Sequence, residues 1–287
     1  MKKIFAVLFF LLLTTQSVFA KDLNKKTPFT IFSGDKKASY FAVASGICNV
    51  FNLIHAKDNY ECFAVASKGS ESNLKSLANQ EADFAIIKTS DFNKFFVKNF
   101  SELENKIDFV AQIHDEYLTI LVQKNLKIDS LNDLNDKSVN IGHIGSSSAL
   151  ILEKYFSNFA INPKKIVNLG AEKSFEMLCN KKIDAWVYFI GHPNPNFQKS
   201  LTNCNLKLIS LPPQEIQNFL ATAPFFKKGI IAKNLYNSLP KNIETISTKT
   251  ILAARKGIDP KITKLFQDIL ENHKEELLKE NEIFRGF

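Results

Sequence analysis

One segment of this chain occurs twice, once in each half. Residues 69–83, which begin Gly-Ser-Glu-Ser-Asn-Leu, return 101 positions later as residues 170–184, which begin Gly-Ala-Glu-Lys-Ser-Phe. Each copy ends in an aspartate followed by an apolar run, and each predicts a loop, a short helix, a turn and a buried strand. The repeat predicts two similarly built α/β lobes, and a cleft between lobes is a common place for a small ligand. Chance likeness between two helix-strand units is the alternative.

The rest of the chain alternates strand-like and helix-like segments, a pattern typical of α/β proteins with mostly parallel sheets. Ser39 is placed to cap the first helix, and residues 260–279 predict one last helix. Strands are expected at 108–113 and 117–123, with the first crossing between the lobes in the junction that separates them. The expected division gives lobe 1 residues 21–115 and 214–287, and lobe 2 residues 116–213.

The N-terminus has the pattern of a secretory signal peptide. Residues 1–20 combine two lysines, an apolar run over 4–13 and a small-residue ending at Ala20, after which cleavage is expected. The run is shorter than the roughly 20 apolar residues that a membrane span needs. No cysteine stands at the cleavage point to carry a lipid anchor. We therefore expect a periplasmic protein.

The charge pattern argues against several classes of partner. The formal net charge is +8, and Arg255 and Arg285 are the two arginines, so a bidentate guanidinium clamp is scarcely available. The lysines are spread along the chain without interleaved aromatic residues, so we expect no nucleic-acid binding. No CxxC or histidine pair has the spacing of metal ligands, and no nucleotide fingerprint appears. Neither a metal nor a cofactor is expected.

Four cysteines lie in the expected mature chain. An even number in an oxidising compartment favours disulfides, and three connectivities are possible. The local pairing joins Cys48 to Cys62 and Cys179 to Cys204, which links adjacent elements of one lobe, as a Cα separation of about 5.5 Å requires. Buried free thiols are the alternative.

Five loops come directly after predicted strands, at 33–40, 67–73, 88–91, 142–148 and 191–196. In open α/β sheets, ligands bind beyond the carboxyl ends of the strands, near helix N-termini. Hydroxyl groups and backbone N–H groups there suit a carboxylate. The candidate ligand-binding residues in or next to these loops are Tyr40, Ser67, Gly69, Ser70, Lys88, Ser90, Gly145, Ser146, Ser147, Tyr188, His192 and Pro193.

Each candidate also has an ordinary structural interpretation. The serines after Gly145 can simply cap a helix, and Lys88 can be a solvated surface lysine. The two prolines of 191–196 can make a stiff turn only. These alternatives stay open at the level of sequence.

An enzyme is the first rival class, and we do not expect one. His143 and His192 fall in predicted cleft loops and could serve as the base for a nucleophile in an exported hydrolase or transferase. The sequence lacks a GxSxG elbow, however. The second rival is a surface antigen that keeps the fold without transport, and a cleft filled by its own side chains would favour it.

Together the loops resemble the TRAP-associated extracytoplasmic immunogenic (TAXI) family, the receptors of tripartite ATP-independent periplasmic (TRAP) transporters. The residues that carry the resemblance are 67–74 with 81–85, 142–148, and 182–185 leading to Gly191-His192-Pro193, and the likeness extends over about 29–279. It implies a type II periplasmic binding protein fold, which is an α/β fold with a ligand cleft between two lobes.

The resemblance also implies a ligand and a partner. The expected ligand is an amino acid such as glutamate or another small carboxylate, passed by a monomeric receptor to the membrane subunits of the transporter. The family's cleft positions fall on Tyr40, Ser67, Gly69, Ser70, Ser90, Gly145, Ser147 and Pro193. Two departures stand out: the first loop, 33–37, has one glycine and three charges where the family is glycine-rich, and Lys249 is placed to intrude on the cleft.

Overall fold

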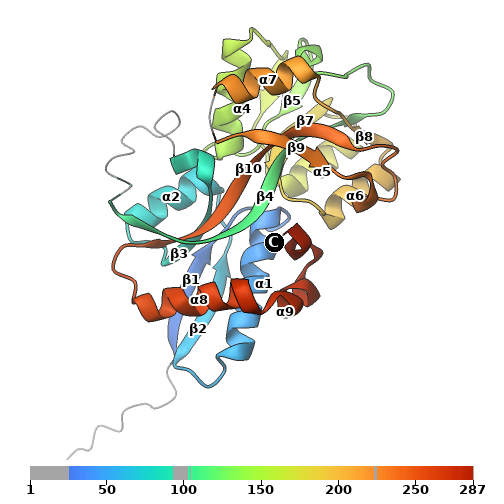
Figure 1. The fold of residues 1–287 in the computed structure, drawn as a ribbon. Helices are drawn as coiled ribbons and strands as arrows, with labels where there is room; N and C mark the ends of the chain where they lie inside the picture. The colour runs from blue at the N-terminus through green and yellow to red at the C-terminus, as the bar shows by residue number, and fades with distance from the viewer. Residues whose placement is uncertain (1–25, 93–102, 104, 223–224, 287) are drawn as a thin grey trace, which may run out of the picture.

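The computed structural model describes residues 26–92, 103, 105–222 and 225–286 (Figure 1). The expected signal peptide, residues 1–20, lies outside the described residues. Among the helices of the described part, none has the length and apolar character needed to cross a membrane.

Each lobe is built on three parallel strands in the same spatial order. The order is β2-β1-β3 in lobe 1 and β6-β5-β7 in lobe 2. The strands are β1 (Thr27–Phe32), β2 (Tyr60–Val65) and β3 (Phe84–Lys88), and β5 (Ser138–Asn140), β6 (Lys165–Val167) and β7 (Ala185–Ile190).

Helices cover the sheets of both lobes, which lie one above the other in Figure 1. Lobe 1 carries α1 (Ser39–Ile54), α2 (Ser70–Ala78), α8 (Pro260–Asn272) and α9 (Lys274–Glu280), and lobe 2 carries α4 (Ser147–Asn158), α5 (Ala171–Cys179), α6 (Pro195–Asn203) and α7 (Pro213–Thr222). The sequence predicts one last helix, and this prediction is wrong. The helix breaks at His273, and the chain turns so that Leu277 of α9 is buried in the core that includes α1.

Two long antiparallel strands, β4 (Ile107–Gln123) and β10 (Ile243–Arg255), run through both lobes. In lobe 1 β10 pairs with β3, and in lobe 2 β4 pairs with β7. Two shorter strands, β8 (Leu206–Leu208) and β9 (Lys227–Ile231), pair with β4 and β10 and complete one hydrogen-bonded sheet of ten strands.

Strand β4 does not stop at the junction where we expect the chain to cross between the lobes. We predicted separate strands on either side of 114–116, whereas β4 is continuous. The reason is its partner: Glu116 and Asp115 pair with Thr248 and Lys249 of β10, and the register shifts only after Lys249. The two lobes are therefore joined by a paired ribbon.

The lobes have separate hydrophobic cores. Phe84 and Phe266 pack in the core of lobe 1, and Tyr155 and Phe189 in that of lobe 2. Residues from 214 onward were expected to return to lobe 1. In the structure, however, Phe219 stacks on Tyr155 at 3.8 Å between ring centroids, within the core of lobe 2. We propose a division in which lobe 2 extends from 116 to 246, and α8 and α9 return the chain to lobe 1.

The internal repeat corresponds to the same pieces of architecture. Helices α2 and α5 occupy equivalent positions, as do strands β3 and β7. Asp83 accepts a hydrogen bond from the Thr30 N–H (3.1 Å), and Asp184 accepts one from the Ser138 N–H (2.8 Å). Each aspartate thus fixes the turn before its strand to a neighbouring strand. The shared aspartates of the repeat therefore stabilise the lobes.

The predicted local disulfides are confirmed. Cys48 of α1 bonds to Cys62 of β2, with Cα atoms 4.9 Å apart, and Cys179 of α5 bonds to Cys204 after α6, with Cα atoms 5.0 Å apart. Each bond stays within one lobe, so neither restricts movement of the lobes relative to each other.

Candidate functional site

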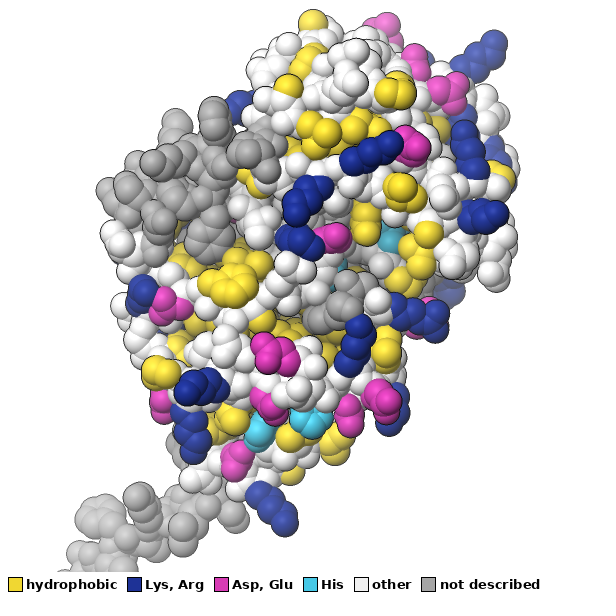
Figure 2. All heavy atoms as spheres, viewed as in Figure 1, with side chains coloured by type: hydrophobic (Ala, Val, Ile, Leu, Met, Phe, Trp, Pro, Cys, Tyr) yellow, Lys and Arg dark blue, Asp and Glu magenta, His cyan; other side chains and the backbone are white. Residues whose placement is uncertain are grey.

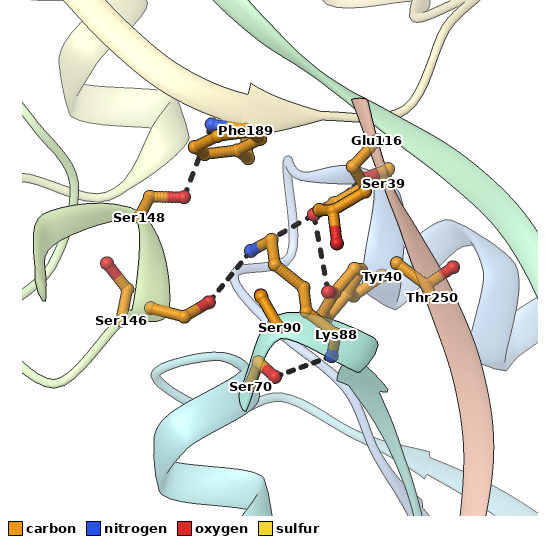
Figure 3. Close-up of polar contacts among 12 residues, drawn as sticks. Ser39, Tyr40, Ser70, Lys88, Ser90, Glu116, Ser146, Ser148, Phe189 and Thr250 are labelled. Carbon is orange, nitrogen blue, oxygen red and sulfur yellow. Dashed lines mark hydrogen bonds and ion pairs between the residues drawn. The ribbon is translucent and has the colours of Figure 1, made fainter. Parts of the chain in front are cut away.

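Lys88 occupies the junction between the lobes. It is the last residue of β3, and its amino group lies 3.0 Å from the Glu116 Oε2 of the crossing strand β4 and 3.0 Å from the Ser147 Oγ of α4 (Figure 3). Its side chain is 4% exposed, so the alternative of a solvated lysine is wrong. The single charge connects lobe 1, the crossing strand and lobe 2.

The Glu116 carboxylate accepts hydrogen bonds from two hydroxyl groups as well as pairing with Lys88. Ser39 Oγ and Tyr40 OH, both at the start of α1, each donate to its carboxylate at 3.3 Å. The predicted capping role of Ser39 is therefore wrong: Ala38 is the N-cap, and the serine hydroxyl is used by Glu116. Burial raises the pKa of Glu116, while the Lys88 charge and these hydrogen bonds oppose that shift.

A second carboxyl group, that of Asp91, is buried beside the pair. It lies in the 3-10 turn η1 (Thr89–Phe92) and accepts hydrogen bonds from Ser70 Oγ and, at 3.4 Å, from Ser90 Oγ. Burial raises the pKa of Asp91, and the Lys88 charge and the hydrogen bonds from Ser70, Ser147 and Ser90 act in the opposite direction. The amino group of Lys88 therefore has two buried carboxyl groups near it, and a third carboxyl group, that of Asp35, lines the cavity.

Aromatic rings surround the lysine. Its Nζ lies 5.4 Å from the ring centroid of Tyr40, 6.0 Å from that of Tyr188 and 5.9 Å from that of Phe189, which are favourable cation–π distances. Burial raises the pKa of Tyr188 well above its ordinary value, so the phenol stays protonated and interacts with Ser146 and Ser148. The rings and hydroxyls make a compact environment suited to an ammonium group.

Little room remains at this place. The cavity between the lobes is about 10 Å³, which suffices for one water molecule at most. In this conformation the cleft is filled by its own side chains. At its mouth lies an open pocket of about 340 Å³, lined by Asp35, Lys36, Ala66, Ser67, His143 and Glu172.

Most predicted site residues meet at the cavity. Its lining includes Tyr40, Gly69, Ser70, Lys88, Ser146 and Tyr188. Ser147 contacts Lys88, and Ser90 contacts Asp91. Ser67 lies at the mouth and donates its hydroxyl to Asn73 at 2.6 Å, and Gly145 belongs to the lobe 2 loop that precedes α4. Ligand contact by these residues stays a prediction.

The structure does not bring His192 and Pro193 to the cavity. His192 is buried in lobe 2, where its Nε2 lies 2.9 Å from Thr119 Oγ1 and its Nδ1 hydrogen-bonds Tyr236 OH. Burial lowers the pKa of His192 to about 3, so the imidazole is neutral. The interpretation of 191–196 as a stiff structural turn fits this arrangement, and ligand contact there does not.

His143, the other histidine that the sequence places in a cleft loop, also has a partner of its own. His143 lies at the cleft mouth, 3.4 Å from Asp35 across the lobes. Ser146 Oγ accepts a hydrogen bond from the Ala149 N–H, which is the ordinary capping geometry, and Ser146 also interacts with Tyr188. No group of three or more possible metal ligands occurs among the described residues.

Sequence reasoning missed Glu116, Asp91 and Ser39. Glu116 is a buried charge inside a strand, and Asp91 lies within the loop 88–91 already singled out. Nothing in the sequence of the crossing strand distinguishes Glu116 from its partly exposed neighbour Asp115 or from Asp108. Lys249, expected to intrude, instead pairs with Asp115 at 2.9 Å and stays one-third exposed.

A larger pocket lies in lobe 2, away from the cavity between the lobes. It measures about 750 Å³ and is lined by leucines and lysines of lobe 2, among them Leu206, Leu208 and Lys207 of β8. None of the predicted site residues reaches it. On the face shown in Figure 2, basic side chains are interspersed with acidic ones and form no continuous track.

Two lobes joined by crossing strands, with a polar cleft between them, define a periplasmic binding protein fold of type II. Similar solved structures include the arginine-, lysine-, histidine-binding protein ArtJ from the thermophilic bacterium Geobacillus stearothermophilus (TM-score 0.55, 14% identity, 91% of this chain and 95% of that one). An ancestral arginine-binding protein bound to arginine gives a TM-score of 0.56 at 14% identity, over 89% and 98% of the two chains. The aliphatic sulphonate binding protein SsuA from Escherichia coli gives 0.52 at 13%, over 90% and 77%.

The family follows from the sequence itself. The model of the NMT1-like family matches residues 31–282, so the chain belongs to the NMT1-like family. Among curated proteins, none matches the sequence.

Proposed function

We propose that this protein is a periplasmic solute-binding receptor that captures a small carboxylate, an amino acid such as glutamate or another organic acid. Membership of the NMT1-like family and the binding-protein fold support a binding role. The resemblance to TAXI receptors supports delivery by a monomer to the membrane subunits of a TRAP transporter. Neither role requires catalysis.

The buried Lys88 is the observation that carries the proposal. A cation at the junction of two lobes, next to the first residues of α1, α2 and α4, is where an anionic group gains both charge and hydrogen-bond donors. The residues Tyr40, Ser70 and Ser147, which carry hydroxyl groups, also lie around the cavity or contact Lys88. A carboxylate that replaced Glu116 on Lys88 would be held from both lobes.

Binding requires the lobes to separate, because the cavity is too small for any solute. Ala38 of lobe 1 packs with apolar residues of lobe 2. The polar contacts across the cleft include Lys88 to Ser147, Asp35 to His143, and the Gly191 N–H to Ser39 Oγ at 3.4 Å. Water can replace such contacts at small cost. A ligand then stabilises closure only to the extent that it binds the closed state better.

A second candidate function is favoured by one observation. The cleft is filled by the Lys88–Glu116 pair, as expected for an antigen that retains the fold without transport. Such a protein would close on itself and bind no small molecule.

A thermal-shift and calorimetric screen of the chain from residue 21 separates the two. Amino acids, oxo acids and dicarboxylates are tested with wild type, Lys88→Met and, as a matched control, Lys249→Met, whose amino group also pairs with an aspartate but outside the cavity. We expect at least one ligand to stabilise wild type and the control, by about 2.7 kcal/mol at a hundredfold excess over Kd, and to lose that effect in Lys88→Met. No shift with any compound would favour the antigen.

The transport partner is tested separately. The mature protein, loaded with a ligand from the screen, is presented to proteoliposomes containing the membrane subunits of a TRAP transporter or of an ABC transporter from the same organism. Uptake with the TRAP subunits alone is the expected result, and uptake with the ABC subunits alone would contradict the TRAP assignment while leaving the receptor role intact.

A further inference from the structure

The charges at the junction are unequal in number. One amino group, that of Lys88, pairs with Glu116, the Lys88 backbone N–H is linked through Ser70 to Asp91, and the side chains of Lys88, Glu116 and Asp91 are nearly inaccessible to water. A further carboxyl group, that of Asp35, lines the cavity but is partly exposed and lies 3.4 Å from His143. Lys88 is the cation that acts on both acids. Any solute that enters between Lys88 and Glu116 breaks an ion pair of 3.0 Å in a buried environment.

We propose that the solute is a zwitterion, whose carboxylate takes the place of Glu116 on Lys88 while its ammonium group takes the place of Lys88 on Glu116, with Asp91 as a second acidic neighbour. The inference rests on the proposed receptor function and defines the class of its ligand. It also assigns Glu116 and Asp91 as specificity-determining residues.

The cost of breaking the pair supports this choice. Removing one partner of a buried ion pair leaves an uncompensated charge, which is strongly unfavourable. A dicarboxylate or an oxo acid offers Lys88 a new partner but leaves Glu116 without one, and adds negative charge next to Asp91. A zwitterion replaces both members of the pair, so no buried charge is left alone.

The surroundings of Glu116 can accept an ammonium group. Its two hydroxyl contacts, from Ser39 and Tyr40, are 3.3 Å long, whereas O–H···O bonds are usually near 2.7–2.8 Å. The Glu116 carboxylate therefore retains acceptor capacity for a stronger donor. The ring of Tyr40 already lies at a cation–π distance from one ammonium group, that of Lys88. The same ring and the two acids match the three donors of a ligand ammonium group.

Protonation of Glu116 is the physical alternative. A neutral Glu116 would allow a simple carboxylate to bind Lys88 without an unpaired charge. In that case complex formation takes up a proton, which calorimetry detects as a dependence of the binding enthalpy on the ionisation enthalpy of the buffer. A zwitterion that replaces the pair needs no proton uptake.

The test compares matched compounds of one carbon skeleton: an α-amino acid, its 2-oxo acid and its amine without the carboxylate, for each skeleton of the screen. Calorimetry on wild-type protein is expected to show the amino acid binding about 100-fold tighter than its oxo acid, without proton uptake. An oxo acid or dicarboxylate that binds as tightly as the amino acid would overturn the inference and leave the receptor function intact. Absence of binding by every compound would overturn both.

Variants of the two acids test which residues favour the amino acid over the oxo acid. Glu116→Gln and Asp91→Asn are each expected to weaken binding of the amino acid at least tenfold and to leave the oxo acid unchanged or tighter. Asp115→Asn, next to Glu116 on β4 but one-third exposed and paired with Lys249, is the control and is expected to bind like wild type. Equal losses for the amino acid and the oxo acid in folded variants would contradict the assignment. The comparison of compounds on wild type decides the inference if a variant does not fold.

Discussion

The amino group of Lys88 and the carboxylate of Glu116 lie 3.0 Å apart with 4% and 2% of their side chains exposed. One residue ends the third strand of lobe 1, and the other lies on the strand that crosses into lobe 2. The pair thus lies between the lobes, at the site that we propose for the ligand.

Replacement of Glu116 by glutamine should destabilise the ligand-free protein. The Lys88 charge would lose its nearest partner in a buried environment, and we expect the free energy of unfolding to fall by about 3 kcal/mol. The double variant Lys88→Met/Glu116→Leu removes both charges and should recover most of that loss, because buried pairs are replaceable by apolar groups. Urea unfolding measures each value.

The exposed pair Lys249–Asp115 provides the comparison on the same two crossing strands. Asp115→Asn should cost less than about 1 kcal/mol, since the charges of an exposed pair stay hydrated. A double variant Lys88→Met/Glu116→Leu as unstable as Glu116→Gln would show that the buried charge is not the cause.

Gly142 is expected to tolerate no side chain. Its φ is +96°, and an added Cβ would lie 2.3 Å from a ring carbon of Tyr188, next to the cavity. Gly142→Ala should therefore combine backbone strain with displacement of Tyr188, and cost about 3 kcal/mol or more in unfolding free energy. Chemical denaturation gives the cost, and near-ultraviolet circular dichroism reports on the tyrosine environment.

A second glycine, Gly257, separates backbone strain from the displacement of Tyr188. Its φ is +84°, but nothing lies within 4 Å of an added Cβ, so Gly257→Ala should show the backbone cost of about 1 kcal/mol alone. If both glycine variants lose the same stability, the contact with Tyr188 contributes nothing.

The lobes were predictable because their signals are local. The repeated glycine and aspartate, with their helix-strand spacing, mark α2 with β3 and α5 with β7, and each aspartate makes the same kind of bond to a neighbouring strand. The lobe to which α7 belongs was not predictable from the sequence. Its apolar residues, such as Ile216 and Phe219, fit any hydrophobic core, and only the partner Tyr155 in space decides between the lobes.

The site was predictable in part for the same reason. Lys88 is the last residue of β3, and the serines of α4 begin the helix that follows β5, so both lie at carboxyl ends of strands that meet between the lobes. Glu116 comes into the site through the pairing of β4 with β10, which no local pattern encodes. His192 also follows a strand, but Tyr236, distant in sequence, binds it within lobe 2.

Each disulfide should stabilise its own lobe. The Cys48–Cys62 bond closes a sequence separation of 14 and the Cys179–Cys204 bond one of 25, and loops of these lengths correspond to about 3 kcal/mol each. Replacement of either pair by alanines should lower the free energy of unfolding by that amount, as measured in urea. Affinity for a ligand should be unchanged, since both bonds lie within single lobes. A change in affinity without a loss of stability would contradict this assignment.

Buried neutral histidines should make the protein sensitive to acid. Burial lowers the pKa of His192 to about 3, whereas an unfolded histidine titrates near 6.5, so the unfolded chain binds a proton that the folded protein excludes. Between these values the free energy of unfolding should fall as the pH falls, by up to about 1.4 kcal/mol per pH unit for each such group. His114, whose pKa burial also lowers to about 3, adds to the effect. The raised pKa values of Glu116 and Asp91 act in the opposite sense.

His192→Gln isolates one contribution, because glutamine keeps a donor and an acceptor for Thr119 and Tyr236 but does not titrate. Urea unfolding at pH 7, 6 and 5 should show the variant losing about 1 kcal/mol less per pH unit than wild type. His273→Gln, at the partly exposed junction of α8 and α9, serves as the control for loss of a histidine outside the buried core. If His192→Gln parallels wild type, the imidazole is protonated in the folded state and its burial does not govern acid stability.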